Sequence, residues 1–204
     1  PLRYYAAHTG RFGGSDKINL QNLPRGSKLR TAIRAPKGQL LYIADLSNIE
    51  ARMLAWLAKE SDLLDAFEQG RDVYCEFASQ IYGRTITKDD NLERYVGKTA
   101  ILGLGYGMGH QKFQDTLKTG SPSVDVSDST AAQIVTQYRG MYTNIPILWS
   151  RMKDLLFNMI SPKQYGTMYG PVEVGPNKLV LPNGMALSYP DLRYAGGEFI
   201  YSTQ

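Results

Sequence analysis

Four side chains spaced four residues apart have the chemistry to bind a nucleotide: Arg94, Lys98, Leu102 and Tyr106. Because four residues of an α-helix advance the azimuth by only about 40°, these side chains form one slowly drifting ridge. Two cations precede an apolar and aromatic end, which is the order that a triphosphate and its attached base would need. The spacing predicts a nucleotide-binding surface on a helix over about residues 89–103.

An ordinary amphipathic helix, with solvated cations and a buried Leu and Tyr, would show the same spacing. The glycines of this segment argue against that alternative. Gly97, Gly103 and Gly105 would each weaken a helix interior by about 1 kcal/mol relative to Ala. Close approach of a ligand or of another backbone would explain them.

A second group of residues surrounds Asp45. The apolar run over residues 39–45 is typical of a buried strand, and Asp45 ends it. Ser47 and Glu50 fit a capping box, and an apolar helical face is expected to follow, made of Ile49, Met53, Trp56 and Leu57. Asp45 could be a structural cap, a surface residue or a ligand for Mg²⁺, which needs only one or two carboxylates beside substrate phosphates.

Together these segments resemble family A DNA polymerases, of the bacterial DNA polymerase I type. The first motif of that family, Asp-x-Ser-x-x-Glu-x-Arg, is matched by Asp45, Ser47, Glu50 and Arg52. The second is matched by Arg94, Lys98, Tyr106 and Gly107. A primer-template segment is matched upstream by Thr9–Phe12 and Asn19–Pro24. The amino-acid sequence around the second motif looks more like the bacteriophage branch of this family.

The resemblance implies a two-metal phosphoryl transfer. Asp45, assisted by the backbone carbonyl of Leu46, would hold two catalytic Mg²⁺ ions. Arg94 and Lys98 would grip the β and γ phosphates, and Lys98 could donate a proton to the leaving pyrophosphate.

The resemblance also implies which residues contact the sugar of the nucleotide. Glu50 would act as a steric gate beneath the sugar, held by a hydrogen bond to Tyr106. Leu102 stands where the family usually has Phe or Tyr, so we expect an altered nucleotide affinity, incorporation rate or sugar discrimination. Tyr74 replaces a frequent His near the phosphates and keeps hydrogen bonding without a titratable imidazole.

Primer-template DNA and deoxynucleoside triphosphates are the expected partners. Arg11, together with Gln21 or Asn22, would contact primer and template. Basic and aromatic side chains are interleaved over residues 1–37, as suits a sugar-phosphate backbone, although a solvated basic loop has the same composition.

One family motif is absent. The third motif, His-Asp-Glu, supplies the other metal-bridging carboxylate, and no His-Asp pair occurs in this sequence. We therefore expect the chain to be a piece of a polymerase, inactive alone and completed by a remainder that carries the third motif. The alternatives are a non-catalytic DNA- or nucleotide-binding module and one half of a split polymerase.

Composition limits the remaining classes. The 204 residues can bury a sizeable core, and the net charge of +4 mildly favours a polyanionic partner. Cys75 is the only cysteine, which excludes an intrachain disulfide and a multi-cysteine zinc site. No run of 18 apolar residues occurs, so no membrane partner is expected, and the predicted location is the cytoplasm, that of the host cell if phage-encoded.

The predicted fold class is α+β. Residues 1–57 would form part of a polymerase palm with antiparallel strands, and residues 58–204 mostly helical fingers ending in a β-hairpin over about 165–190. Apolar periodicity and glycine or proline turns predict helices at 47–58, 62–69, 72–82, 89–103, 109–119, 128–140 and 145–160. Pro176-Asn177 and Asn183-Gly184 are expected turns of the hairpin region.

Overall fold

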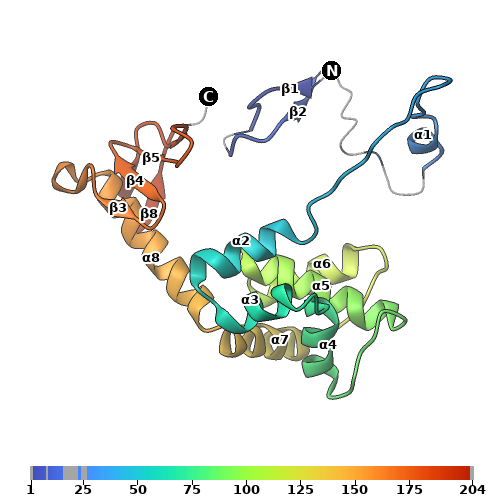
Figure 1. Ribbon diagram of the computed structural model, residues 1–204. Helices are drawn as coiled ribbons and strands as arrows, with labels where there is room; N and C mark the ends of the chain where they lie inside the picture. The colour runs from blue at the N-terminus through green and yellow to red at the C-terminus, as the bar shows by residue number, and fades with distance from the viewer. Residues whose placement is uncertain (1, 8, 16–22, 24–26, 203–204) are drawn as a thin grey trace. The chain divides into compact units, whose positions relative to one another are not determined.

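The computed structural model describes residues 2–7, 9–15, 23 and 27–202. Two compact units divide the chain: residues 46–154 form one, and residues 1–45 with 155–204 form the other (Figure 1). The first of these, called here the helical unit, contains the predicted nucleotide-binding ridge. The other contains small antiparallel sheets. The predicted α+β class is confirmed.

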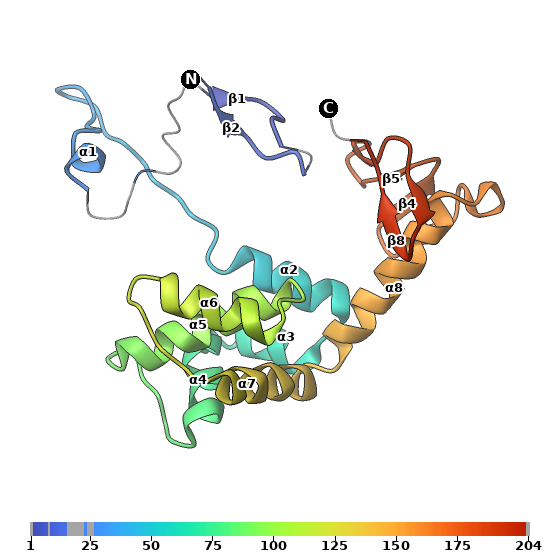
Figure 2. The ribbon, with the colours of Figure 1, turned by 180° about the vertical axis from the view of Figure 1, so that it is seen from behind.

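One central helix organises the helical unit. Helix α5 (Asn91–Gly105) packs against four others, α2, α4, α6 and α7 (Figures 1 and 2). The helices that surround it are α2 (Ile49–Ala58), α3 (Ser61–Glu68), α4 (Val73–Tyr82), α6 (His110–Thr119), α7 (Asp128–Met141) and the start of α8 (Asn144–Met159). Phe77, Phe113 and Tyr138 are buried at their centre. None of the described helices has the length and apolar character needed to cross a bilayer.

Side-chain caps and glycines set several helix ends. The Asp72 carboxylate accepts the backbone N–H groups of Tyr74 and Cys75 and so starts α4, which ends at Gly83 in the left-handed region (φ 63°). Ser127 caps α7 by accepting the N–H of Thr130. The seven predicted helices are confirmed, and their ends agree with the observed ones to within two residues.

The other unit has a four-stranded antiparallel sheet in the order β3–β4–β5–β6. Its strands are β3 (Met168–Tyr169), β4 (Val172–Gly175), β5 (Lys178–Val180) and β6 (Ala186–Ser188). The predicted bend lies between β4 and β5, where Asn177 has φ 53°, and the predicted turn at Asn183-Gly184 lies between β5 and β6. The hairpin expected over about 165–190 is therefore part of a larger sheet, which packs on Leu155 and Met159 of α8.

Short elements complete this unit. They are β1 (Leu2–Arg3) paired with β2 (Gly13–Gly14), helix α1 (Lys28–Thr31), the 3₁₀ turn η2 (Pro162–Gln164), and β7 (Arg193–Ala195) paired with β8 (Glu198–Ile200). All were absent from the sequence prediction. Their short length explains this, since two to four residues carry almost no periodicity.

The predicted strand over residues 39–45 is wrong. These residues have no regular secondary structure, and Tyr42 and Ile43 are 87% and 86% exposed. A strand needs a neighbouring strand to accept and donate its backbone hydrogen bonds, and no described residue provides one here. The apolar run has the composition of a β-strand, but it forms no strand and its side chains are exposed.

The predicted capping of α2 is also wrong. Asn48 is the N-cap, in a left-handed conformation (φ 56°), and no side-chain cap bond is formed, so Ser47 and Glu50 do not make a capping box. The buried side of α2 consists of Ala51 and Ala55, whose small side chains allow the core helices to approach closely. The predicted apolar face is 41–53% exposed: Ile49, Met53, Trp56 and Leu57.

Candidate nucleotide-binding site

Helix α5 carries the predicted ridge. Arg94, Lys98 and Leu102 lie within the helix, and Tyr106 is its C-cap residue. Arg94, Lys98 and Leu102 are partly buried, while Tyr106 is 70% exposed. No described residue forms an ion pair with Lys98. The ridge thus presents cations at one end and an accessible aromatic ring at the other.

Gly97 explains how α5 can lie so close to α4. A Cβ at this position would stand 2.2 Å from the backbone oxygen of Tyr74 and 3.0 Å from the Cβ of Ala78. Only glycine permits such a distance, because a backbone oxygen cannot rotate away. The close approach of another backbone, one of the two explanations offered by the sequence, accounts for Gly97.

The other two glycines of α5 have different neighbours. A Cβ on Gly105 would lie 2.8 Å from Cδ2 of Leu54, so this glycine lets α2 approach the end of α5. A Cβ on Gly103 would meet only the flexible end of Met108, at 3.0 Å. Gly105 therefore helps to shape the space beside the ridge, whereas Gly103 has a less strict packing requirement.

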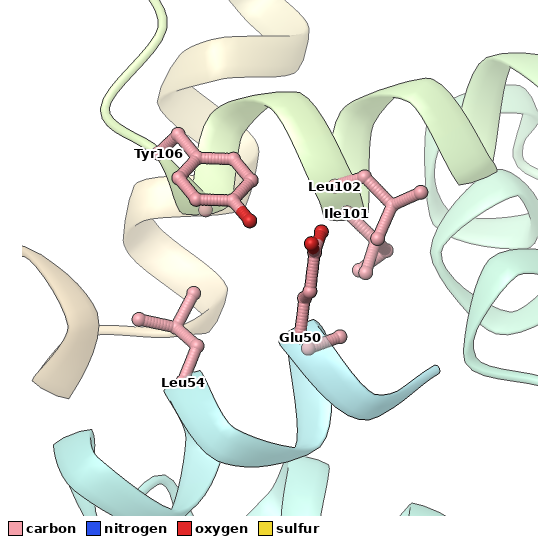
Figure 3. Close-up of a pocket in the computed structure, with 7 residues that line it drawn as sticks. Glu50, Leu54, Ile101, Leu102 and Tyr106 are labelled. Atoms are coloured by element: carbon pink, nitrogen blue, oxygen red, sulfur yellow. The ribbon is translucent and has the colours of Figure 1, made fainter. Parts of the chain in front are cut away.

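A small open pocket lies between α2 and the end of α5. Its lining consists of Glu50, Ala51, Leu54, Ile101, Leu102, Gly105 and Tyr106. Figure 3 shows the Glu50 carboxylate and the Tyr106 hydroxyl directed into the same space, with Leu102 beside Glu50. The structure brings together three predicted sugar-end residues, which come from two helices about fifty positions apart in the sequence. An apolar wall with one carboxylate and one phenol can accept a ring that carries hydroxyl groups.

Arg94 is held by a carboxylate at the start of α4. Its Nε and Nη2 both donate to Oδ2 of Asp72, at 3.0 and 2.8 Å. The other carboxylate oxygen, Oδ1, accepts the N–H groups of Tyr74 and Cys75. Burial alone would raise the pKa of Asp72, but the hydrogen bonds from Arg94, Cys75 and Tyr74 together hold this pKa below its ordinary value of 3.8.

Tyr74 contacts Arg94 from a second side. The Arg94 Cζ lies 5.5 Å from the centre of the Tyr74 ring, within the range of a cation–π contact. The Tyr74 hydroxyl donates to Oδ1 of Asn48 at 2.7 Å, which links the start of α4 to the start of α2. Burial raises the pKa of Tyr74, so the phenol stays protonated and keeps this donor at neutral pH.

Two residues of this network escaped the sequence prediction. Neither Asp72 nor Asn48 was among the residues predicted to form the site. An Asp just before an apolar run is a helix-start signal and could have identified the cap. Nothing in a single sequence pairs Asp72 with Arg94, 22 residues away, or Asn48 with Tyr74.

The remaining predicted residues lie outside this group. Asp45 and Arg11 belong to the other unit, and both are exposed. Gln21 and Asn22 lie outside the described residues. Within the described part of the chain, no group of three or more His, Cys, Asp or Glu side chains is arranged to hold a metal ion. The donors predicted for Mg²⁺, the Asp45 carboxylate and the Leu46 carbonyl, are too few to fill its coordination shell, so nucleotide phosphates and a further carboxylate would have to complete it.

Comparison with known proteins identifies the class. The family model "DNA polymerase family A" matches residues 2–168. The chain therefore belongs to DNA polymerase family A.

Particular relatives agree with this assignment. The chain is 39% identical over 116 residues to the thermostable DNA polymerase I of Thermus aquaticus, covering 55% of the chain and 14% of the relative. It is 32% identical over 159 residues to the DNA polymerase I of Helicobacter pylori strain 26695, covering 72% and 16%. It resembles a structure of the Pol1 POL domain of M. smegmatis in complex with DNA primer-template and dNTP, with TM-score 0.58 and 25% identity over 83% of the chain and 29% of that domain. The chain thus spans about one sixth or less of the two bacterial relatives.

Proposed function

We propose that this chain is the nucleotide-gripping part of a template-directed DNA polymerase that adds deoxynucleotides to a primer 3′ end. The observation that carries the proposal is the ridge on α5, where an anchored Arg94 and a Lys98 with no ion-pair partner among the described residues lead to a pocket lined by Glu50 and Tyr106. The named function of the relatives and the primer-template DNA and dNTP bound to the M. smegmatis domain support it.

Each part of the nucleotide has a proposed contact. Arg94 and Lys98 bind the β and γ phosphates, because a guanidinium edge and a mobile ammonium match phosphate oxygens. Lys98 also supplies a proton to the leaving pyrophosphate. Leu102 and Tyr106 pack against the base and sugar, and Glu50 lies under the sugar, where a 2′ hydroxyl would meet it.

The primer end is assigned to residues 1–46. Arg11, with Gln21 or Asn22, contacts primer and template, and Asp45 with the Leu46 carbonyl would hold Mg²⁺. When bound, a pair of Mg²⁺ ions activates the primer 3′ hydroxyl and stabilises the charge of the leaving group. In this proposal residues 1–57 belong to the palm and residues 58–204 to the fingers, as the sequence predicted.

The experiment is primer extension with Mg²⁺ and the four deoxynucleotides. It compares the full-length protein that contains this chain, its Asp45→Ala variant and, as a matched control, Asp125→Ala, an exposed loop carboxylate. The proposal predicts extension that Asp45→Ala abolishes and Asp125→Ala leaves unchanged. Extension by the Asp45→Ala protein at the wild-type rate would contradict the proposal.

A second candidate, a non-catalytic nucleotide-binding module, rests on the absence of a His-Asp pair from these 204 residues. For the same reason, we expect the isolated chain to bind nucleotide or DNA without extending a primer, unless another chain supplies the missing carboxylate. Salt-sensitive DNA binding by a full-length protein that never extends primers would favour the module. A copurifying chain with a His-Asp-Glu segment would favour a split enzyme.

A further inference from the structure

Two contacts fix the guanidinium of Arg94 before any ligand arrives. Asp72 binds its Nε and Nη2 edge, and the Tyr74 ring lies against its face. The hydrogen bonds to Asp72 use Nε and Nη2, and the Cys75 thiol also interacts with the Arg94 side chain. An arginine on a helix surface ordinarily loses much side-chain entropy when it binds a phosphate, so a guanidinium that is already fixed loses less.

Asp72 is itself rigid. Its Oδ1 accepts two backbone N–H groups of α4, at 3.1 and 3.2 Å, and its side chain is only 19% exposed. Gly97, three residues after Arg94, allows α4 and α5 to pack with almost no space between them. The carboxylate that binds Arg94 is therefore attached to a helix end that cannot easily move relative to α5.

We infer that Asp72 is a positioning residue for nucleotide binding, which holds the guanidinium of Arg94 in the orientation that binds the phosphates of the incoming triphosphate, with Tyr74 supporting the guanidinium from its face. This inference rests on the proposed function. Asp72 does not touch the nucleotide and acts only through Arg94.

Because Asp72 is charged, the inference and a purely electrostatic account predict opposite changes in nucleotide affinity when the charge is removed. A carboxylate beside a triphosphate site repels the ligand, so removing that charge would tighten binding if electrostatic attraction alone mattered. If orientation matters more, removing the carboxylate weakens binding despite the more positive site. The two accounts predict opposite changes.

The test is a double-mutant cycle on the full-length protein, with variants Asp72→Asn, Arg94→Ala and both together. Asn keeps an oxygen that can cap α4 but loses the charged pair. We expect Asp72→Asn to raise the KM for deoxynucleotides roughly tenfold in the Arg94 protein and to have no further effect in the Arg94→Ala protein. The same cycle on the Kd of inorganic tripolyphosphate should give the same ratio, since the phosphates are the proposed contact.

Controls separate this role from a structural one. Glu76→Gln breaks another ion pair on α4, between Glu76 and Arg71 at 2.9 Å, and should leave KM unchanged. Asp72→Ser, which retains a capping oxygen, should weaken binding as Asp72→Asn does. A purely structural role would raise KM equally with and without Arg94.

Three results would overturn the inference: an unchanged KM, tighter tripolyphosphate binding by Asp72→Asn, or equal effects in both backgrounds. A failure of the proposed function looks different, because wild-type protein would then not extend primers. The tripolyphosphate cycle still decides the role of Asp72 in that case.

Discussion

Gly97→Ala is the substitution for which the structure predicts the clearest loss of stability. The added Cβ would stand 2.2 Å from the Tyr74 backbone oxygen, whereas close carbon–oxygen contacts lie near 3.3 Å, so α4 and α5 would have to separate by about 1 Å. The affected interface is buried and includes Phe77, Val96 and Ala100. Because the obstacle is backbone, no rotamer change relieves it.

The magnitude follows from two opposing terms. Overpacking of a tight core costs up to about 3 kcal/mol, and Ala regains about 1 kcal/mol of helix propensity over Gly. The expected net loss is about 2 kcal/mol in the free energy of unfolding, or a fall of roughly 4–8 °C in melting temperature for a chain of this size. Since Gly97 lies between Arg94 and Lys98, separation of the helices should also weaken nucleotide binding.

The assay is urea and thermal unfolding of the 204-residue chain, followed by the helical circular dichroism signal. Gly140→Ala is the matched control, because Gly140 lies in α7 with nothing within 4 Å of the added Cβ, and it should stabilise by about 0.5–1 kcal/mol. A Gly97→Ala protein as stable as the wild type, beside a control that behaves as expected, would refute the close packing of α4 on α5.

Three further outcomes are expected. Leu102→Tyr should change the KM for deoxynucleotides, the incorporation rate or the preference over ribonucleotides, and all three unchanged would contradict the placement of Leu102 beside the sugar and base. Tyr74→Phe should cost about 1 kcal/mol of stability, measured by urea unfolding, because Oδ1 of Asn48 loses its donor, and unchanged nucleotide affinity would remove Tyr74 from the site. The lowered pKa of Asp72 means that its pairing with Arg94 stabilises the fold above pH 3.8 and is lost as the pH falls below that value. Asp72→Asn should therefore be less stable by about 1 kcal/mol at pH 7 and lose less stability below pH 3.8, whereas parallel pH–stability curves would argue against the pair.

The helices could be read from the sequence because their signals are local. Apolar spacing marks the buried faces of α4 and α5, and glycine or proline marks most ends. The same local reasoning missed the β7–β8 hairpin, although Gly196-Gly197 between its strands has φ of 62° and 87° and is a hairpin-turn signal. Strands this short are recognisable mainly by their turn.

The predictions that failed depend on tertiary neighbours, which a single sequence does not show. Residues 39–45 have the composition of a strand but no described neighbour to pair with. The apolar face of α2 was predicted from the helical spacing of large side chains, whereas the residues buried in the core are Ala51 and Ala55. Burial is decided by which surface meets another element, and small residues often permit the closest meeting.

In the candidate site too, the motif residues could be predicted from the sequence, whereas the tertiary contacts that hold them could not. The motif residues Arg94 and Glu50 were predicted from spacing and family resemblance, and they lie on two helices that the core brings together. The orientation of Arg94, however, depends on residues outside the motif: Gly97, which sets the distance between α4 and α5, and Asp72, which binds the guanidinium. Because the same helix α5 forms the core and carries the ridge, a substitution that changes its packing also changes the site. A loss of nucleotide binding in any ridge variant is therefore evidence of a lost contact only when the unfolding free energy of that variant is unchanged.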